Sequence, residues 1–215
     1  MKKLVVFDLD GTLADTIDDL GYAVNFALKE YNLPELPLEL YHTLVGNGME
    51  DLVRRSMGER GSDDELYLRV RKSFDEYYDA HSGDNTVPYE GIAELLSELS
   101  ERGVCTAVLT NKAHRYVGSI LAKCFPCHEF SLFYGQCEGI KRKPHPQALE
   151  LMLSELGYKK EDCLYIGDSE VDVKTALNAR VDLVAVTWGY RSAEQIKNAG
   201  ASVIVDTPRE ILNYV

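Results

Sequence analysis

The stretch that decides the fold is residues 3–13, Lys-Leu-Val-Val-Phe-Asp-Leu-Asp-Gly-Thr-Leu. The apolar run at residues 4–7 is typical of a short strand buried on both faces. Asp8 and Asp10 follow it, and an extended backbone directs side chains two residues apart to the same side. Gly11 then permits a sharp turn. We therefore predict a parallel strand with a carboxylate pair at its carboxyl end, where open α/β sheets bind ligands.

The spacing of this carboxylate pair indicates a cation. Asp8 and Asp10 repel each other unless a positive charge lies between them or one of them stays protonated. Ligand sets made only of oxygen favour Mg²⁺. Asp-Gly after a strand is also a common turn signal. This segment alone therefore leaves a solvated turn and a magnesium site open.

Composition limits the classes of function. The chain has 215 residues, of which 45% are apolar and 27% charged, as in a globular protein of one large domain or one domain with an insert. Its net charge of −12 would repel nucleic acid and acidic membranes, so we expect neither as a partner. Five cysteines without a regular framework indicate reduced thiols in a cytoplasmic protein. We expect no secretory signal and no membrane span, because no apolar run is long enough.

The first part of the chain reads as helical. Apolar residues at helical spacing follow the first strand, and no buried strand is expected before about residue 82. Gly46-Asn47-Gly48 divides this block, and Ser62-x-x-Glu65 has the pattern of a capping box. The expected helices after the first one cover about 37–44, 49–57 and 63–80.

Strands and helices alternate through the rest of the chain. This order favours βαβ units on a parallel sheet. We therefore predict an α/β protein with a doubly wound parallel sheet, built from residues 1–14 and 83–215. An α-helical cap at residues 15–82 is inserted directly after the first strand. Further strands are expected at about 104–109, 130–134, 163–166, 183–186 and 203–205.

Three more polar groups fall at or between predicted strand ends. Thr110 follows one strand, Asp168 follows another, and Lys143 lies in a basic run between them. The carboxyl ends of parallel strands converge on one crevice. Carboxylates, a hydroxyl and an ammonium group suit phosphoryl transfer, which depends on positioning and charge neutralisation. An aspartate can attack phosphorus and divide the displacement into two easier steps.

Each of these residues also has an ordinary explanation. Thr110 and Asn111 can cap a helix, the lysines can be solvated, and Asp172 can be an exposed acid in the first turn of a helix. Lys141 is an alternative to Lys143, although the following Pro-His-Pro favours Lys143. The convergence of all these groups in one order favours a site.

These stretches carry a family resemblance that covers essentially the whole chain. They resemble, in the usual order, the four motifs of the haloacid dehalogenase superfamily, and the insert resembles the small helical cap of its phosphatase branch. Within that branch the chain is most similar to phosphoglycolate phosphatases, with Val45-Gly46-Asn47-Gly48 in the cap. The four motifs are Asp8-x-Asp10-Gly11-Thr12, Thr110-Asn111, Lys143-Pro144 and Gly167-Asp168-x-x-x-Asp172.

The resemblance implies a phosphatase that depends on Mg²⁺ and forms an aspartyl-phosphate. It implies that Asp8 is the nucleophile and a metal ligand. Asp10 would bind the metal through its backbone carbonyl and act as general acid and then base. Asp168 would be a further metal ligand, and Asp172 a ligand or a support for the site.

The same resemblance gives the phosphate-binding groups. Thr110 would hold the transferring phosphate, with help from the backbone near Asn111. Lys143 would neutralise the charge of the nucleophile and the phosphate.

The cap is expected to select the substrate. Gly46, Asn47 and Gly48 can present backbone N–H groups to an anion. Arg54 or Arg55 can face a substrate carboxylate, although a surface salt bridge is the ordinary alternative.

The resemblance is less specific for the substrate than for the superfamily. We expect a small phosphorylated metabolite as partner, and a monomer or homodimer. Phosphoglycolate fits, while sugar phosphates, pyrophosphate and nucleotide monophosphates stay open. A β-phosphoglucomutase-like mutase shares the same site, and a non-enzymatic receiver-like module is a remote alternative.

Overall fold

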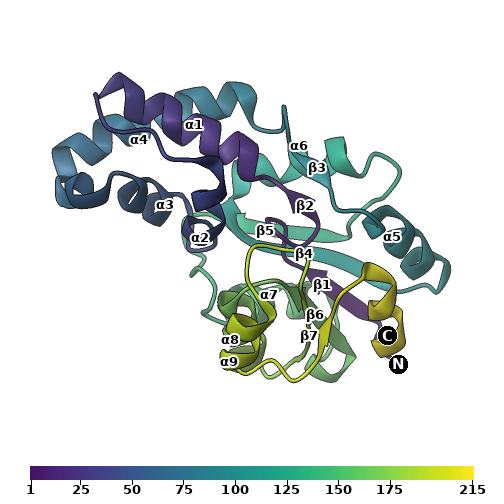
Figure 1. Cartoon of the computed structure of the whole chain (residues 1–215). Helices are drawn as coiled ribbons and strands as arrows, with labels where there is room; N and C mark the ends of the chain where they lie inside the picture. Colours follow the sequence, from purple (N-terminus) through teal and green to yellow (C-terminus); the bar gives the residue numbers. More distant parts are fainter.

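The computed structural model describes the whole chain, residues 1–215, and has at its centre a six-stranded sheet (Figure 1). The strand order is β5-β4-β1-β6-β7-β8, and every neighbouring pair is parallel. The central strand β1 is completely buried, as its unbroken apolar run predicts. The expected doubly wound α/β fold is therefore confirmed. The strands are β1 (Leu4–Phe7), β4 (Cys105–Ala113), β5 (Leu132–Gln136), β6 (Cys163–Gly167), β7 (Asp182–Val186) and β8 (Ile204–Val205).

Helices cover both faces of this sheet because side chains of β1 alternate between them. Val6 packs in one cluster with Met152 of α7 and Ala176 of α8. Val5 and Phe7 belong to the larger cluster on the other face, which includes residues of α5 and α6. The helices of the core are α5 (Ile92–Glu101), α6 (His114–Cys124), α7 (Gln147–Leu156), α8 (Glu170–Ala179) and α9 (Ala193–Asn198), with 3₁₀ turns η3 (Lys160–Asp162) and η4 (Pro208–Tyr214).

A helical block follows β1 and lies beside the carboxyl end of the sheet, at the upper left in Figure 1. Its first helix α1 packs against its last helix α4. The cap elements are α1 (Ile17–Glu30), η1 (Leu38–Leu40), α2 (Tyr41–Leu44), α3 (Met49–Ser56), η2 (Gly58–Ser62) and α4 (Asp64–His81). The helical insert expected after the first strand is therefore present.

The start of α4 differs from the prediction in one detail. Asp63, not Ser62, is the capping residue, and its side chain accepts a hydrogen bond from the backbone N–H of Leu66 at 3.0 Å. The Ser62 hydroxyl donates instead to the carbonyl of Glu59 in the preceding 3₁₀ turn. The predicted capping box at Ser62 is wrong because the helix begins one residue later.

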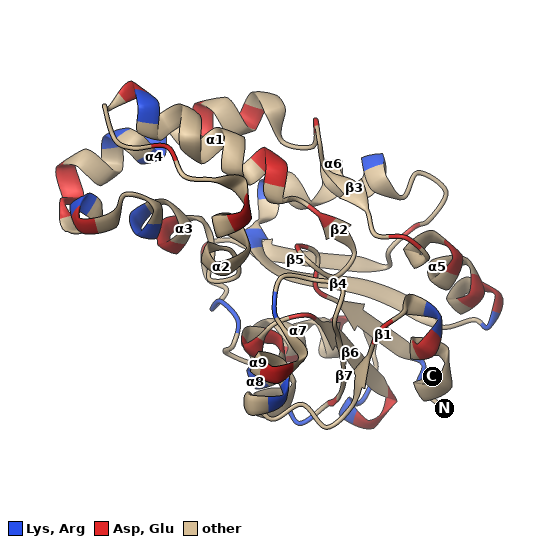
Figure 2. Ribbon diagram, viewed as in Figure 1, with Lys and Arg blue, Asp and Glu red and all other residues tan.

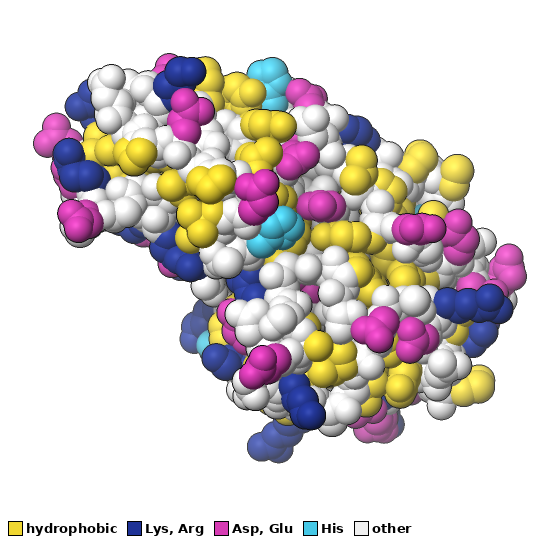
Figure 3. Space-filling model, viewed as in Figure 1, with side chains coloured by type: hydrophobic (Ala, Val, Ile, Leu, Met, Phe, Trp, Pro, Cys, Tyr) yellow, Lys and Arg dark blue, Asp and Glu magenta, His cyan; other side chains and the backbone are white.

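The chain crosses between core and cap twice, and the two crossings lie side by side. Strands β2 (Ala14–Asp15) and β3 (Val87–Pro88) form a short antiparallel ribbon. In the cap, Asp19 accepts hydrogen bonds from the backbone N–H groups of Gly83 and Thr86, both at 2.9 Å. Figure 3 shows cap and core as two lobes that meet at a narrower waist. We propose the division into residues 1–14 with 83–215 and residues 15–82.

Charged side chains are spread over both lobes. Asp and Glu outnumber Lys and Arg, 35 to 23, and Figure 2 shows them on cap and core alike. All five cysteines are free thiols. No helix combines the length and the apolar character that a membrane span needs.

Candidate active site

The polar residues predicted at three strand ends lie together between core and cap. Asp8 follows β1, Asp168 follows β6, and Thr110 lies near the end of β4. Strand β4 is longer than predicted and reaches Ala113, with an irregular register after Leu109. The cavity lining includes Asp8, Asp10, Gly46, Gly48, Thr110, Asn111, Lys112, Asp168, Ser169 and Arg191. It encloses about 30 Å³, room for no more than a few water molecules.

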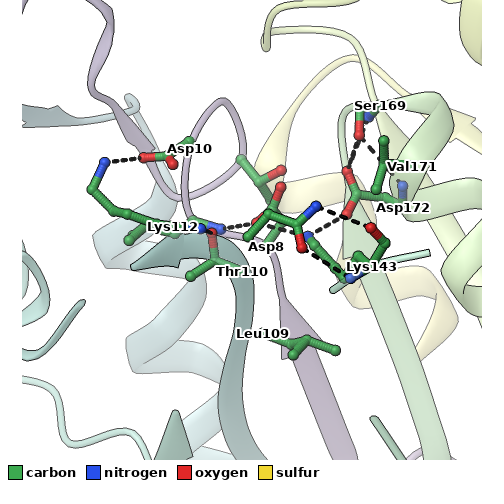
Figure 4. Close-up of polar contacts among 12 residues, drawn as sticks. Asp8, Asp10, Leu109, Thr110, Lys112, Lys143, Ser169, Val171 and Asp172 are labelled. Carbon is green, nitrogen blue, oxygen red and sulfur yellow. Dashed lines mark hydrogen bonds and ion pairs between the residues drawn. The ribbon is translucent and has the colours of Figure 1, made fainter. Parts of the chain in front are cut away.

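Asp8 is at the centre of the site and has a partner cation (Figure 4). The Lys143 Nζ lies 2.9 Å from Asp8 Oδ1, which also accepts the backbone N–H of Leu9 at 2.7 Å. Burial and the neighbouring carboxylates raise the pKa of Asp8, while Lys143 opposes this rise. The other carboxylate oxygen of Asp8 is free of these contacts.

Lys143 is held by a second acid, Asp172. The Lys143 Nζ lies 2.7 Å from Asp172 Oδ1 and donates a hydrogen bond to the Tyr165 hydroxyl at 3.1 Å. Burial alone would lower the pKa of Lys143, but Asp172 and Asp8 raise it well above its ordinary value. Asp172 also caps α8, where its Oδ2 accepts the Ser169 hydroxyl at 2.5 Å and the Ser169 backbone N–H at 3.1 Å. These contacts occupy both oxygens of Asp172, so its main role is to position Lys143.

Three carboxylates are close enough to share one cation. Single oxygen atoms of Asp8, Asp168 and Asp172 lie within 4.8 Å of one another, and all three residues are buried. Burial and the charge of Asp172 raise the pKa of Asp168 to about 7. A divalent cation would relieve the repulsion in this set.

The backbone packs closely against the Asp168 carboxylate, whose Oδ2 accepts the backbone N–H of Tyr190 at 2.7 Å and whose Oδ1 accepts the Thr12 hydroxyl at 3.3 Å. A Cβ added at Gly11 would lie 2.5 Å from Asp168 Oδ2, and one at Gly189 would lie 2.4 Å from it. Gly11 also has a φ of +86°, which favours glycine. The chemistry of the donor set, buried carboxylate oxygens of Asp8 and Asp168, fits an oxygen-bound metal such as Mg²⁺.

Asp10 points away from this triad. Its Oδ1 lies 2.9 Å from the Nζ of Lys112 and accepts the Thr16 hydroxyl at 2.7 Å. Burial alone would lower the pKa of Lys112, but Asp10 and Tyr78 raise it above its ordinary value. Asp10 thus lies in a different environment from Asp8, with Lys112 and not Lys143 as its partner cation.

Asn111 ties the core loop to the cap. Its Oδ1 accepts the backbone N–H of Lys143 at 2.9 Å. Its Nδ2 donates to the carbonyls of Lys143 at 3.1 Å and Gly46 at 3.0 Å. The structure therefore gives the Asn111 side chain a positioning role between the Lys143 loop and the cap. Lys141, the alternative to Lys143, is exposed and lies near His145.

The cap residues named from the sequence divide into two groups. Gly46 and Gly48 line the cavity. Asn47 instead contributes its carbonyl oxygen to Arg142 at 3.0 Å. Arg54 does not reach the site, because its guanidinium pairs with Glu50 and Asp64 on the outer side of the cap.

Several residues of the site were missed in the sequence. Lys112 is two residues after Thr110, so strand alternation would have placed both on one side. Ser169 precedes Asp172 by three residues, which is a capping-box spacing. Arg191 had no such signal, because its loop after β7 meets the cap only in the folded chain. Its guanidinium donates to the carbonyls of His42 and Val45 and pairs with Glu170.

Relatives of known family match this chain over nearly its full length. The family described as haloacid dehalogenase-like hydrolase matches residues 5–186. A phosphoglycolate phosphatase of Pseudomonas savastanoi pv. phaseolicola is 35% identical over 99% of this chain and 79% of the relative. One of Haemophilus influenzae (strain 86-028NP) is 34% identical over 99% of this chain and 98% of the relative.

Solved structures agree with the sequence matches. A crystal structure from Lactobacillus delbrueckii subsp. bulgaricus has a TM-score of 0.92 and 33% identity, over 100% of this chain and 98% of that one. The family match covers most of the chain and includes the first and last of the predicted motifs. The chain belongs to the haloacid dehalogenase-like hydrolase family.

Proposed function

We propose that this protein is a Mg²⁺-dependent phosphatase that hydrolyses a small phosphomonoester through an aspartyl-phosphate. The observation that carries the proposal is the buried ion pair of Lys143 with Asp8, at 2.9 Å, within a set of three carboxylates. A carboxylate at the end of a central strand, beside a fixed ammonium group, is suited to attack an anionic phosphoryl group. The relatives named phosphoglycolate phosphatase support the same chemistry.

The first half-reaction transfers the phosphoryl group to the protein. The free oxygen of Asp8 forms a bond to phosphorus as the bond from phosphorus to the ester oxygen breaks. Asp10 donates its proton to that departing oxygen, so an alcohol leaves. Lys143 balances the charge of Asp8 and of the transferring group, and the Thr110 hydroxyl lies on the same cavity wall.

The second half-reaction returns Asp8 to its first state. A water molecule attacks phosphorus, Asp10 takes its proton, and the bond from phosphorus to the Asp8 oxygen breaks. Inorganic phosphate leaves. Asp8, Asp168 and the backbone carbonyl of Asp10 would hold Mg²⁺, which supplies charge neutralisation for the phosphoryl oxygens.

Phosphoglycolate is the substrate that we propose. The named relatives support this choice. The cavity is small and its cap side is apolar, with Leu20, Val45, Met49 and Leu52, so a short leaving group suits it. The cavity volume of about 30 Å³ is small even for phosphoglycolate, and we propose that the cap moves as the substrate enters.

Replacement of the nucleophile tests the proposal. We expect Asp8→Asn to lower turnover of phosphoglycolate with Mg²⁺ by on the order of 10⁴-fold or more, because an amide does not attack phosphorus. Acid-quenched wild-type protein should carry phosphate, and the variant should not. Asp18→Asn on the exposed side of α1 is the matched control and should act as wild type. Substantial turnover by Asp8→Asn would overturn the nucleophile assignment. Formation of glucose 6-phosphate from β-glucose 1-phosphate, without phosphate release, would indicate the mutase alternative.

A further inference from the structure

The cations in and next to the cavity differ in how many of their N–H donors already have an acceptor; Lys112 and Arg191 line it, and Lys143 lies beside Asp8. Lys143 is shared between Asp8 and Asp172, at 2.9 and 2.7 Å. Arg191 donates to two cap carbonyls and pairs with Glu170. The guanidinium of Arg191 is therefore committed to holding the cap. Neither cation has its charge free for a second anionic group of a substrate.

Lys112 is the cation of the cavity lining that keeps unused donors. Its side chain is 1% exposed, and its one salt bridge is to Asp10 Oδ1 at 2.9 Å. An ammonium group has three N–H donors. Its other charged or aromatic neighbour is the ring of Tyr78 in α4, with Nζ 5.3 Å from the ring centroid. Lys112 is a lining residue of the cavity, and its ammonium lies between Asp10 and the Tyr78 ring with Asp10 as its hydrogen-bond acceptor, so hydrogen-bonding capacity is left.

The cap supplies no cation of its own to this cavity. Its lining residues are Leu20, Val45, Gly46, Gly48, Met49 and Leu52, all without charge. Arg54, the cap cation considered for this role, pairs with Glu50 and Asp64 instead. A charged group on the leaving alcohol would be desolvated against an apolar wall, and burying such a charge without a partner is unfavourable. Its counter-charge must come from the core side.

We propose that the Lys112 ammonium binds a carboxylate on the carbon atom that carries the ester oxygen, and so selects phosphorylated 2-hydroxy acids. This inference rests on the proposed phosphatase function and names the recognition element of that site. Asp10 must come within hydrogen-bond distance of the leaving oxygen to protonate it. Lys112 Nζ is 2.9 Å from Asp10 Oδ1, so a carboxylate one carbon beyond that oxygen falls next to it.

A matched pair of substrates measures this recognition. Phosphoglycolate carries the carboxylate, and its amide, 2-phosphooxyacetamide, has nearly the same size and leaving oxygen without the charge. The value of kcat/KM includes binding and the transfer to Asp8. We expect the wild-type protein to prefer phosphoglycolate by on the order of 100-fold, as for a buried charge pair.

Two variants test whether Lys112 is the source of the preference. Lys112→Met removes the charge at similar length, and Lys112→Gln keeps a donor for Asp10 while removing the charge. Both should reduce the preference for phosphoglycolate to below about threefold, mainly by lowering kcat/KM for the carboxylate. The control Lys197→Met, on the exposed side of α9, should keep the wild-type ratio. Because each variant is judged by a ratio, any effect through Asp10 that is common to both substrates cancels.

The outcomes separate this inference from the proposed function. A wild-type protein that hydrolyses both compounds equally would overturn the role of Lys112 and leave the phosphatase function standing. Variants that lose activity equally on both compounds would show that Lys112 acts only through Asp10. This outcome also overturns the proposal that Lys112 binds the substrate carboxylate. If the wild-type protein hydrolyses neither these compounds nor p-nitrophenyl phosphate with Mg²⁺, the proposed function itself fails. If Lys112→Met does not fold, the test still rests on Lys112→Gln and on the wild-type ratio of kcat/KM for phosphoglycolate to kcat/KM for 2-phosphooxyacetamide.

Discussion

Arg191 Nη2 lies 2.6 Å from the carbonyl oxygen of Val45, so a core arginine binds the backbone of the cap. The same guanidinium also donates to the carbonyl of His42. Asn111 and Arg142 bind the next two carbonyls of this loop, those of Gly46 and Asn47. Core side chains therefore hold the cap loop through its backbone, largely independently of the side chains that the loop carries.

We expect Arg191→Met to weaken closure of the cap. Two charge-assisted hydrogen bonds to carbonyls are lost, each worth about 1.5–3 kcal/mol. KM for phosphoglycolate should rise by about tenfold or more, while kcat falls less, because Arg191 does not contact Asp8 or Asp10. Steady-state kinetics measures the changes in KM and kcat separately. Arg209→Met, at an exposed position, is the control. A fall in kcat alone would show that Arg191 acts in the chemistry and not in closure.

Removal of Lys143 should affect both activity and stability. Lys143→Met leaves Asp8 and Asp172 buried without their common partner, and breaking a buried pair costs about 3–5 kcal/mol. We expect kcat to fall by at least about 100-fold, and urea unfolding to shift to lower concentration. Lys141→Met removes an exposed lysine two residues away and should change neither quantity. Equal effects of the two substitutions would contradict the assignment of Lys143.

Metal binding should be visible in thermal unfolding. A ligand at 100 times its Kd stabilises the native state by about 2.7 kcal/mol. In a chain of this size Mg²⁺ should then raise the Tm by about 5–10 °C, and a chelator should reverse the change. Asp168→Asn should remove this response. Asp182→Asn, at the exposed start of β7 and the other end of the sheet, should keep it. An unchanged response in Asp168→Asn would place the metal elsewhere.

Asp19 should make the stability depend on pH. Burial would raise its pKa, but hydrogen bonds from residues 83–86 lower it below its ordinary value. A lowered pKa in the folded state gives stability that is complete above the unfolded pKa of about 3.9 and is lost as pH falls through the folded value. Asp19→Asn should therefore lower the free energy of unfolding at pH 7 by about 1–3 kcal/mol.

The same variant should differ less from wild type as the pH falls below the unfolded pKa of about 3.9, because the stability from the lowered pKa of Asp19 is then being lost. Asp18→Asn, one residue earlier on the exposed side of α1, provides the control and should not change the pH profile. Urea unfolding at several pH values measures the free energy of unfolding of both variants and of the wild-type protein. A deficit of Asp19→Asn that does not shrink on acidification would show that its carboxylate charge is not the source.

The fold could be predicted because its signals are local. The apolar run of β1 and the alternation of strands and helices after residue 83 fix the sheet, since each depends on neighbouring residues. The end of β4 was missed, because the polar residues Thr110 and Lys112 hide a strand that continues to Ala113. The ribbon of β2 and β3 was also missed, because its two residues per strand carry no periodicity.

Part of the site was predictable because its polar residues come directly after predicted strands. Asp8, Thr110 and Asp168 were found in this way, whereas Arg191 was not. Its partners are backbone carbonyls of the cap, which have no residue-type signal. Arg54 was chosen because it is a cation in the cap, but the sequence does not show which side of α3 faces the core.

The ribbon of β2 and β3 has a mechanical consequence for Asp10. We propose the paired crossings at Ala14 and Pro88 as the axis about which the cap turns. A rotating body displaces each point in proportion to its distance from the axis. Asp10 forms an isolated bridge with Ala14 and so lies close to these crossings. A turn of the cap about them would move the loop at Gly46–Gly48 farther than Asp10, and Asp10 would keep its place beside Asp8.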